Sequence, residues 1–209
     1  MRLVRVWITL LGVGLGIVGC AGPQLSPVTI PTQRLEFEGF SILPPHGENW
    51  LVTPPAIRAK QGSNVIVSFY KRLNRPSKTH TVIAVVASVW LPAEMGTRAE
   101  RLQKYAQAAL TGRYRPVMVN ISPDGTLAPD CIRIDATTED RGVPGYPGTP
   151  FIADTHAFVC FHPDWPEAAI DIHYSQRRLL EEAPLSLEAE GEPFVRSLIF
   201  TRLPGRSSP

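Results

Sequence analysis

Alternating and continuous runs of apolar residues predict most of the chain as β-strands. Residues 64–72 (NVIVSFYKR) and 79–91 (THTVIAVVASVWL) are rich in Val and Ile, which favours strands in both segments. The second run is almost continuously apolar, so we expect a central strand that is covered on both faces. Further short strands are predicted over residues 37–45, 49–55, 114–122 and 167–177.

Two other segments show the three- and four-residue spacing of helices. Residues 93–112 predict a long helix that Gly112 stops, and residues 188–200 predict a closing helix. The expected apolar faces consist of Leu102, Tyr105, Ala106, Ala109 and Leu110 in the first helix, and of Phe194, Val195, Leu198 and Ile199 in the second. This order of elements predicts an α+β fold in which helices flank a mostly antiparallel sheet.

Parts of this pattern resemble a known fold family. The opening GFSILPPHGENW (residues 39–50), the central strand pair, the long helix and the closing FVRSLIF (residues 194–200) are similar to the PsbP-like fold. That fold is a sandwich of a sheet between helices, shared by the extrinsic protein P of photosystem II, a Ran-binding nuclear-import factor and many bacterial lipoproteins. The resemblance covers most of residues 37–200. It implies a protein that binds or assists a larger assembly, without shared catalytic residues.

The N-terminus has the features of a secreted precursor. Arg2 and Arg5 precede an uncharged apolar run over residues 6–18, which is shorter than the roughly 20 residues that cross a bilayer. The run closes with Ile17-Val18-Gly19-Cys20, which resembles the lipobox of bacterial lipoproteins. The resemblance implies cleavage before Cys20 and acyl chains on that cysteine. The alternative is an ordinary signal peptide with an incidental cysteine.

We therefore expect four parts: a signal peptide at 1–19, a lipidated cysteine and Pro-rich tether at 20–33, one globular domain at 34–203, and a disordered tail at 204–209. The domain of roughly 170 residues is long enough to bury a core. The lipid on Cys20 would hold it to the membrane of a bacterial cell envelope. Ala21 stands where an aspartate would favour inner-membrane retention, so a host with two membranes would carry it on the outer membrane, facing the periplasm.

Charge provides no second means of attachment. The full chain has 21 basic and 19 acidic residues, and removal of Arg2 and Arg5 with the leader leaves 19 of each. A formal net charge of zero gives no general attraction to nucleic acid or to an anionic lipid surface. We therefore expect a lipid anchor and no nucleic-acid partner.

The two remaining cysteines, Cys131 and Cys160, occupy similar settings. Their segments, residues 130–140 and 155–163, both alternate like strands. If the two segments form an antiparallel hairpin around the Pro/Gly-rich loop at 141–150, the cysteines can lie opposite each other. An oxidising compartment favours a disulfide there, which for a loop of about 30 residues contributes roughly 3 kcal/mol. A redox or metal-binding pair and two buried thiols are the alternatives, although no CxxC motif exists.

The histidines and serines form no recognised motif. His46, His80, His156, His162 and His173 lack the tight local spacing of most zinc ligands, so we expect no metal and no cofactor. Ser68 and Ser175 lie within predicted strands, and no GxSxG motif is present. The sequence therefore assigns no catalytic residue.

Acidic residues offer one enzymatic alternative. Asp135, Glu139 and Asp140 lie close in sequence, and Asp130 and Asp164 have settings that could bring them near. Paired carboxylates perform acid–base chemistry in glycosidases. A strand end that enters a polar loop also commonly carries such residues as a solvated edge.

Aromatic residues in two loops suggest a contact surface. Tyr146 lies at the tip of the loop at 141–150, and Trp165 lies in the segment FHPDWP at 161–166. Loops on a rigid scaffold often carry binding, although a simple hairpin connection would have the same composition. We expect Tyr146 and Trp165 to contact a partner.

These observations favour a non-enzymatic envelope lipoprotein that binds or supports another envelope component. One alternative is a glycan-directed hydrolase that uses carboxylates near Asp135–Asp140. The other is a small-molecule carrier with an apolar cavity between sheet and helix. The sequence leaves the carrier open because a strand that lines a cavity has the same pattern as a core strand.

Overall fold

The computed structural model describes residues 25–54, 56–59, 63–74 and 77–202. The signal peptide expected at 1–19, the lipidated Cys20 and the tail expected at 204–209 lie outside these residues, so their roles stay predictions. The described chain forms a single domain of mostly antiparallel β-structure with two helices, which confirms the α+β class.

The strands form two sheets. The larger sheet has the order β1-β4-β6-β7-β11-β10-β9-β8, with β5 paired to β6, and all of its pairings are antiparallel. Its strands are β1 (Ser26–Pro27), β4 (Trp50–Val52), β5 (Ala56–Ala59), β6 (Ser63–Lys71), β7 (Thr81–Trp90), β8 (Tyr114–Pro123), β9 (Cys131–Asp140), β10 (Phe151–His162) and β11 (Trp165–Leu179). The small sheet has the order β12-β3-β2 and consists of β2 (Leu35–Phe37), β3 (Phe40–Ile42) and β12 (Ile199–Phe200).

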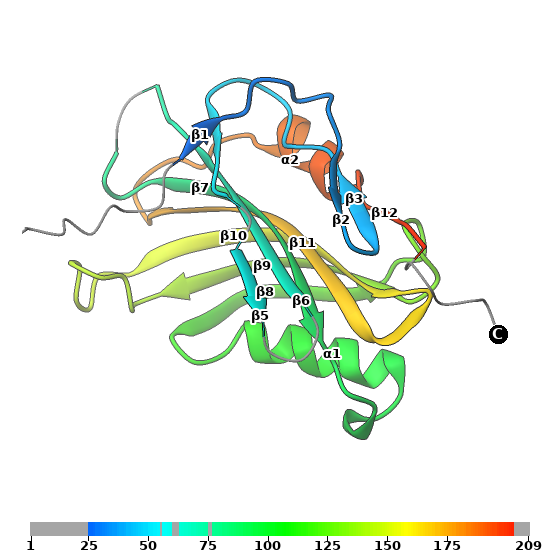
Figure 1. The fold of residues 1–209 in the computed structure, drawn as a ribbon. Coiled ribbons are helices and arrows are strands. Elements are labelled where there is room, and N and C mark those ends of the chain that lie inside the picture. The colour runs from blue at the N-terminus through cyan, green and yellow to red at the C-terminus, as the bar shows by residue number, and fades with distance from the viewer. Residues whose placement is uncertain (1–24, 55, 60–62, 75–76, 203–209) are drawn as a thin grey trace, which may run out of the picture.

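The helices lie on opposite faces of the large sheet (Figure 1). The long helix α1 (Arg98–Ala109), preceded by a short 3-10 turn η1 (Ala93–Met95), covers one face near β9 and β10. The shorter helix α2 (Glu188–Val195) and the small sheet cover the other face. Each face has its own apolar core, with Phe69 and Phe194 in the core of the α2 face and Leu102 and Phe161 in that of the α1 face.

The central strand β7 is buried on one face only. It pairs with β6 and β11, so its predicted central position is correct. However, Val82, Ala84 and Val86 are buried, whereas the alternate residues Ile83 and Val85 are only half-buried. The expectation that both faces would be covered is therefore wrong. The side chains on the second face lie on the α1 side, where the sheet is incompletely covered.

The cysteine hairpin forms as predicted. Strands β9 and β10 pair antiparallel from Phe151 opposite Asp140 to Cys160 opposite Cys131, and a disulfide joins the two cysteines. Both cysteines are buried in the core of the α2 face. The loop at 141–150 connects the far end of this hairpin.

The first helix is shorter than predicted. Gly96 has a φ of 117°, a conformation that side-chain-bearing residues rarely adopt, and it separates η1 from α1. Thr97 then starts α1 as its N-cap, because its side chain accepts from the Glu100 amide while the Glu100 carboxylate accepts from the Thr97 amide. The helix ends before Gly112, whose φ of 81° agrees with the predicted stop.

The second helix also ends early. It stops at Val195, and Ile199 and Phe200 form β12 against β3 instead of a last helical turn. Phe194, Val195 and Leu198 are buried as predicted, but Ile199 is exposed. Pairing with a strand from the start of the domain determines this end, and such a distant partner leaves no local signal.

Candidate functional site

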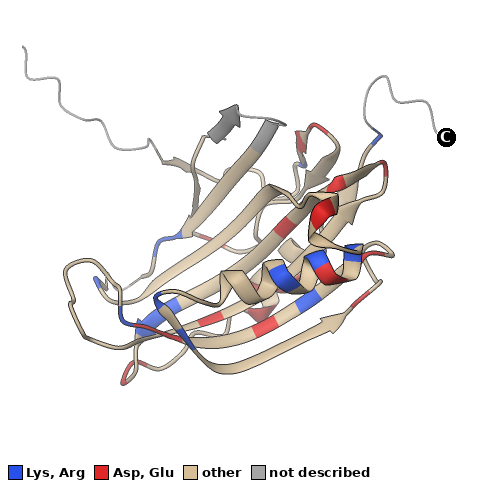
Figure 2. Cartoon of the chain, turned by 90° about the horizontal axis from the view of Figure 1, so that it is seen from below, with Lys and Arg blue, Asp and Glu red and all other residues tan. Residues whose placement is uncertain are grey.

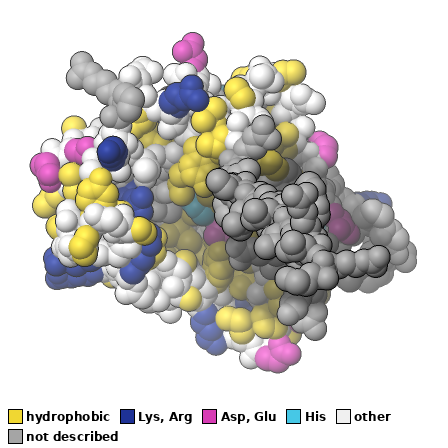
Figure 3. Space-filling model, turned by 60° about the vertical axis from the view of Figure 1, so that its left-hand side comes forward, with side chains coloured by type: hydrophobic (Ala, Val, Ile, Leu, Met, Phe, Trp, Pro, Cys, Tyr) yellow, Lys and Arg dark blue, Asp and Glu magenta, His cyan; other side chains and the backbone are white. Residues whose placement is uncertain are grey.

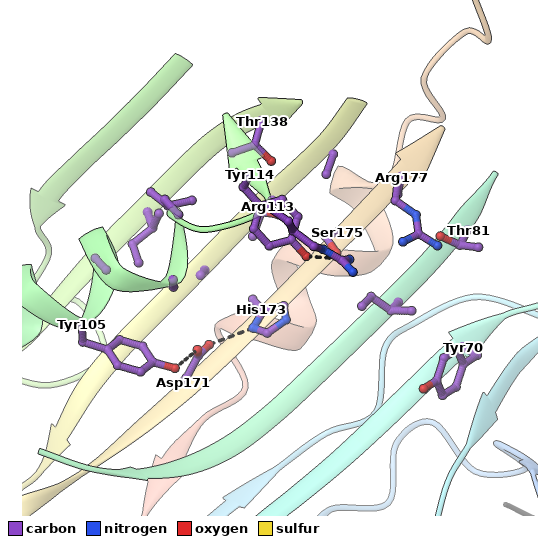
Figure 4. Close-up of a pocket in the computed structure, with 18 residues that line it drawn as sticks. Tyr70, Thr81, Tyr105, Arg113, Tyr114, Thr138, Asp171, His173, Ser175 and Arg177 are labelled. Carbon is purple, nitrogen blue, oxygen red and sulfur yellow. Dashed lines mark hydrogen bonds and ion pairs between the residues drawn. The ribbon is translucent and has the colours of Figure 1, made fainter. Parts of the chain in front are cut away.

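A cavity of about 500 Å³ lies between α1 and the large sheet. Its floor comes from residues of β6, β7, β9, β10 and β11 (Figure 4). Its roof comes from α1, the residues that connect α1 to β8, and the first residue of β8. A volume of this size falls within the range of pockets that hold small organic ligands. In the space-filling view, hydrophobic side chains gather around a hollow with one histidine visible inside it (Figure 3).

The row of polar side chains on β11 is the main feature of the floor. Because side chains alternate along a strand, Asp171, His173, Ser175 and Arg177 all line the cavity. The residues between them face α2, and they are buried. The clean alternation of residues 167–177 therefore forms two different surfaces, one apolar and closed, the other polar and open to the cavity.

Small side chains create the space beneath the helix. Ala106 and Ala109 line the cavity from α1, and Ala153 and Ala157 line it from β10. Side chains this short leave the second half of the helix without contacts that fill the gap above β11 and β7. The apolar walls are completed by Ile83, Leu110 and Ile134.

A hydrogen-bonded triad occupies one part of the cavity (Figure 4). The Tyr105 hydroxyl donates to Asp171 Oδ2 over 2.6 Å, and His173 Nδ1 lies 2.8 Å from Asp171 Oδ1. Burial by itself would lower the pKa of His173, but the Asp171 carboxylate raises it above the ordinary value. Burial would likewise raise the pKa of Asp171, but the charge of His173 and the two hydrogen bonds hold that pKa below its usual range.

The neighbouring serine does not join this group as a nucleophile. Ser175 lines the same cavity and follows His173 on the same face of β11, but no hydrogen bond joins the two in the described part of the chain. Acyl transfer by a serine needs such a contact with its base. The arrangement Asp171–His173–Ser175 thus orients a histidine without activating a serine.

Two arginines share one carboxylate in another part of the cavity. Arg113, just before β8, lies 2.9 Å from Asp140 Oδ2, and Arg177 lies 3.6 Å from the same atom. The Asp140 side chain is fully buried, and its Oδ1 accepts from the amide of Gly142 over 2.9 Å. A side chain at Gly142 would press against Arg113, so the start of the loop at 141–150 is fitted closely to this cluster.

The charged residues of α1 do not extend this positive cluster. Figure 2 shows basic and acidic residues on the helix as seen from its solvent side. The basic side chains have partners of their own, since Arg98 pairs with Asp130, Arg101 donates to the backbone oxygen of Leu91, and Lys104 donates to that of Met95. None of these three side chains lines the cavity.

The carboxylates considered for hydrolysis do not converge. Asp140 points to the α1 side and pairs with the two arginines, whereas Asp135 hydrogen-bonds to Arg133 and His156, which line a hollow beside α2. Glu139, next to Asp140 and thus on the opposite face from it, pairs with Arg141. Asp140 therefore cannot flank a glycosidic bond together with either of the other two. Asp135 and Glu139 share a face but lie four positions apart along β9, about 13 Å, which is farther than paired catalytic carboxylates lie, so this set does not supply a carboxylate pair.

A smaller hollow of about 320 Å³ lies beside α2. Most of its charged groups are already paired, since Arg133 donates to Asp135 over 3.0 Å and to Glu192 over 3.1 Å, and Asp154 lies 3.4 Å from Arg178. His156 Nδ1 lies 2.7 Å from Asp135. Burial would raise the pKa of Asp135, but the hydrogen bonds from Arg133 and His156 keep it below the usual range. These satisfied pairs leave less binding capacity than the larger cavity.

The two aromatic residues expected to form a contact surface lie far apart. Tyr146 is in the loop before β10 and packs edge-to-face on Phe151, at a centroid distance of 5.4 Å. Trp165 begins β11, beyond the other end of β10, and packs on Trp90 at 5.8 Å. A strand of this length spans about 40 Å. The structure therefore does not bring Tyr146 and Trp165 into one surface.

The histidines are also dispersed. His80 contacts Gln176, His162 contacts the backbone oxygen of Gly39, and His156 and His173 lie on opposite faces of the sheet. Within the described residues, no group of three or more histidine, cysteine or acidic side chains is arranged to hold a metal ion.

One sequence pattern is a signal for the cavity floor. Polar residues at 171, 173, 175 and 177 indicate the second face of β11, but an exposed strand face would carry the same residues. Only the position of α1 over this row distinguishes a site from a solvated surface.

No helix in the described ranges has the length and apolar character needed to cross a bilayer. Comparisons of the sequence with models of known families and with curated proteins find no match.

Proposed function

We propose that this chain is a lipid-anchored protein of the bacterial cell envelope, and that its domain is a non-enzymatic binding module. The cavity beneath α1 is its binding site, and the ligand is a small, largely apolar molecule. The proposal joins two hypotheses from the sequence, the binding module for an envelope component and the small-molecule carrier. The two agree if the envelope component that the domain binds is a small molecule.

The observation that carries the proposal is the cavity itself. A volume of about 500 Å³ with apolar walls and a few polar groups has the character of a ligand pocket. Closely packed protein interiors normally leave no gap of this size between a helix and the sheet beneath it. The alanines that create the space, Ala106, Ala109, Ala153 and Ala157, come from two elements that are distant in sequence.

Two features support the anchor and the fold family. The run that ends in Ile17-Val18-Gly19-Cys20 has the residues of a lipobox, and acyl chains on Cys20 would hold the domain at the membrane. The order of layers, with a helix on each face of an antiparallel sheet, is the order expected for a PsbP-like sandwich. In a host with two membranes, we propose the outer membrane facing the periplasm.

The binding site can be tested with the ligand that the protein carries in its cells. We would purify the full-length protein and a Thr155→Phe variant from the same membranes in the same detergent. Bound small molecules would then be extracted and identified by mass spectrometry. The Thr155 side chain lines the cavity from β10 and has no hydrogen-bond partner among the described residues, so its replacement by a phenyl ring breaks no side-chain hydrogen bond and fills the space.

A matched variant separates blocking from general damage. Val117→Phe adds the same ring on the edge strand β8, where Val117 is 62% exposed and outside the cavity. We expect one molecule to accompany the wild type and Val117→Phe but not Thr155→Phe, with all three proteins folded by circular dichroism. If no molecule is enriched with the wild type over Thr155→Phe, the cavity is not a binding site.

The anchor has a separate test. Cells given labelled palmitate should label the wild type and not a Cys20→Ser variant, because the thiol is the site of acylation. An equally labelled Cys20→Ser protein would contradict the assignment of Cys20.

A further inference from the structure

We infer that the ligand of this cavity is an organic anion, with one carboxylate or phosphate held by Arg113 and Arg177 and a single apolar chain lying beneath α1. This inference rests on the proposed function, because it assigns a chemical class to the ligand of the same site.

The charges around Arg113 and Arg177 do not balance. Both guanidinium groups line the cavity, and the carboxylate that both contact is Asp140. Glu139 next to it faces the other side of the sheet and pairs with Arg141. Two positive charges against one negative charge leave one positive charge uncompensated in this part of the cavity.

Asp171, the acidic residue that lines the cavity itself, does not correct this balance. Asp171 lies three positions along the same face of β11 from Arg177, a distance of about 20 Å. Its oxygens are already engaged by Tyr105 and His173. Since interactions over such a distance are largely screened, Asp171 does not neutralise the arginines.

The two arginines have hydrogen-bonding capacity left for a ligand. Arg177 Nε is buried and has no acceptor within the described residues. A buried donor without an acceptor is costly, and a guanidinium fork matches the two oxygens of a carboxylate or phosphate. Arg113 is partly exposed, so its side chain can move to meet a ligand.

The remaining walls of the cavity are mostly apolar. Between the arginines and the Tyr105–Asp171 pair, the cavity is bounded by Ile83, Ala109 and Leu110 together with other short apolar side chains. Such walls favour hydrocarbon, because binding there removes the apolar surface of the ligand from water. A positive group beside apolar walls is complementary to an amphipathic anion.

Competition for the site would test the charge requirement directly. The full-length protein would be placed in lipid nanodiscs and photolabelled with a photoactivatable C16 fatty acid, and the labelled residues would be mapped by mass spectrometry. Palmitate, hexadecyl phosphate and 1-hexadecanol then compete for labelling. Palmitate and hexadecyl phosphate have the same C16 chain as 1-hexadecanol but carry a negative charge. Whichever of the two anions competes more strongly shows whether the site prefers a carboxylate or a phosphate.

We expect label on cavity residues, and we expect at least one of the two anions to compete about tenfold or more better than the alcohol. Arg177→Met should reduce that preference by roughly ten- to a hundredfold, as for loss of a hydrogen bond to a charged group. Each competitor partitions into the nanodisc lipid to the same extent whichever variant is present. A change in the preference for anion over alcohol therefore reports the contribution of the arginine alone. Arg177→Lys, which keeps the charge, should retain part of it.

Two further variants keep the test decisive. Arg115→Met removes an arginine on β8 that is 78% exposed and outside the cavity, and it should leave the preference unchanged. Arg113→Met, at a more exposed cavity position, provides a second test if Arg177→Met fails to fold.

The possible failures are distinguishable. Equal competition by anions and alcohol, or a preference that survives Arg177→Met and Arg113→Met, would overturn the anionic ligand while leaving an apolar binding site. Absence of saturable labelling in the cavity would overturn the single-chain anion as ligand. The proposed function is judged separately, by the molecules that accompany the wild type but not Thr155→Phe.

Discussion

On the α2 face of the large sheet, strand β11 presents Ile170, Ile172 and Tyr174, all buried, whereas on the α1 face the same strand presents Asp171, His173 and Ser175. The helices differ in the same way. Gly191 brings α2 so close to β11 that an added Cβ would lie 2.4 Å from the Tyr174 ring. On the other face, alanines of α1 border the cavity of about 500 Å³.

This difference shows how one sheet can serve both stability and binding. The α2 face holds the larger set of aromatic core residues and the disulfide. The α1 face has a smaller core, centred on Leu102 and Phe161, and leaves the rest of its area to the cavity. We therefore expect changes on the α2 face to alter stability, and changes in the cavity to alter binding.

The largest effect is expected from a core aromatic on the α2 face. Phe194 is fully buried and packs edge-to-face on Phe69 at 5.6 Å. Phe194→Ala should lower the free energy of unfolding by about 3–5 kcal/mol through lost transfer energy and the cavity left behind. Urea unfolding would measure the loss. The control Ile199→Ala, at a residue that is 52% exposed, should cost far less.

Loss of the disulfide should have the next largest effect. Cys131 and Cys160 are 29 residues apart in sequence, so the bond restricts the unfolded chain by about 3–4 kcal/mol in the loop-entropy description. The double variant Cys131→Ala with Cys160→Ala should lose that amount in urea unfolding. Ligand retention at temperatures where this variant stays folded should be normal, because both cysteines lie on the face opposite the cavity. A loss of binding in the folded variant would contradict the division between the two faces.

Adding atoms should distinguish the faces more directly than removing them. Gly191→Ala adds one methyl group against the buried Tyr174 ring and should cost about 1–3 kcal/mol. Thr155→Phe adds a whole ring into the cavity, so its cost should be less than about 1 kcal/mol. Thermal unfolding of both variants would measure the comparison. Equal losses would mean that the cavity is as tightly packed as the core.

The smallest effect on stability is expected from changes in the protonation of His173 and Asp171. Asp171 raises the pKa of His173 above 6.5, so the pair contributes stability that is complete below pH 6.5 and is lost as the pH rises through the folded value. The lowered pKa of Asp171 adds stability above about pH 3.8, which is lost at more acidic pH. His173→Gln should therefore be more destabilising at pH 5.5 than at pH 9.

Urea unfolding at several pH values would test this dependence. His46→Gln, at an exposed histidine outside the cavity, provides the matched substitution against which His173→Gln is compared at each pH. A pH-independent effect of His173→Gln would indicate that the Asp171–His173 pair contributes by packing alone.

Strand faces, the disulfide and the fold class could be predicted from the sequence, because each depends on the pattern of residues within short segments. Period-two alternation fixed which residues of β9, β10 and β11 share a face, and the matched settings of Cys131 and Cys160 predicted the disulfide that the structure confirms. The α+β class followed from the order of such elements. The predicted helix boundaries were less accurate. Gly96 interrupts the first predicted helix, and the last residues of the second form strand β12, which pairs with β3.

Tertiary structure alone decided which face became a site. The row Asp171–His173–Ser175–Arg177 has the pattern of a solvated strand face, and the alanines of α1 and β10 have the pattern of core positions. Likewise, only the sheet shows that Tyr146 and Trp165 lie at opposite ends of β10, and that Asp140 lies between two arginines that are distant in sequence. Local pattern fixes the direction of a side chain, whereas a cavity depends on how far apart two packed elements lie, and that distance is set by contacts between residues remote in the chain.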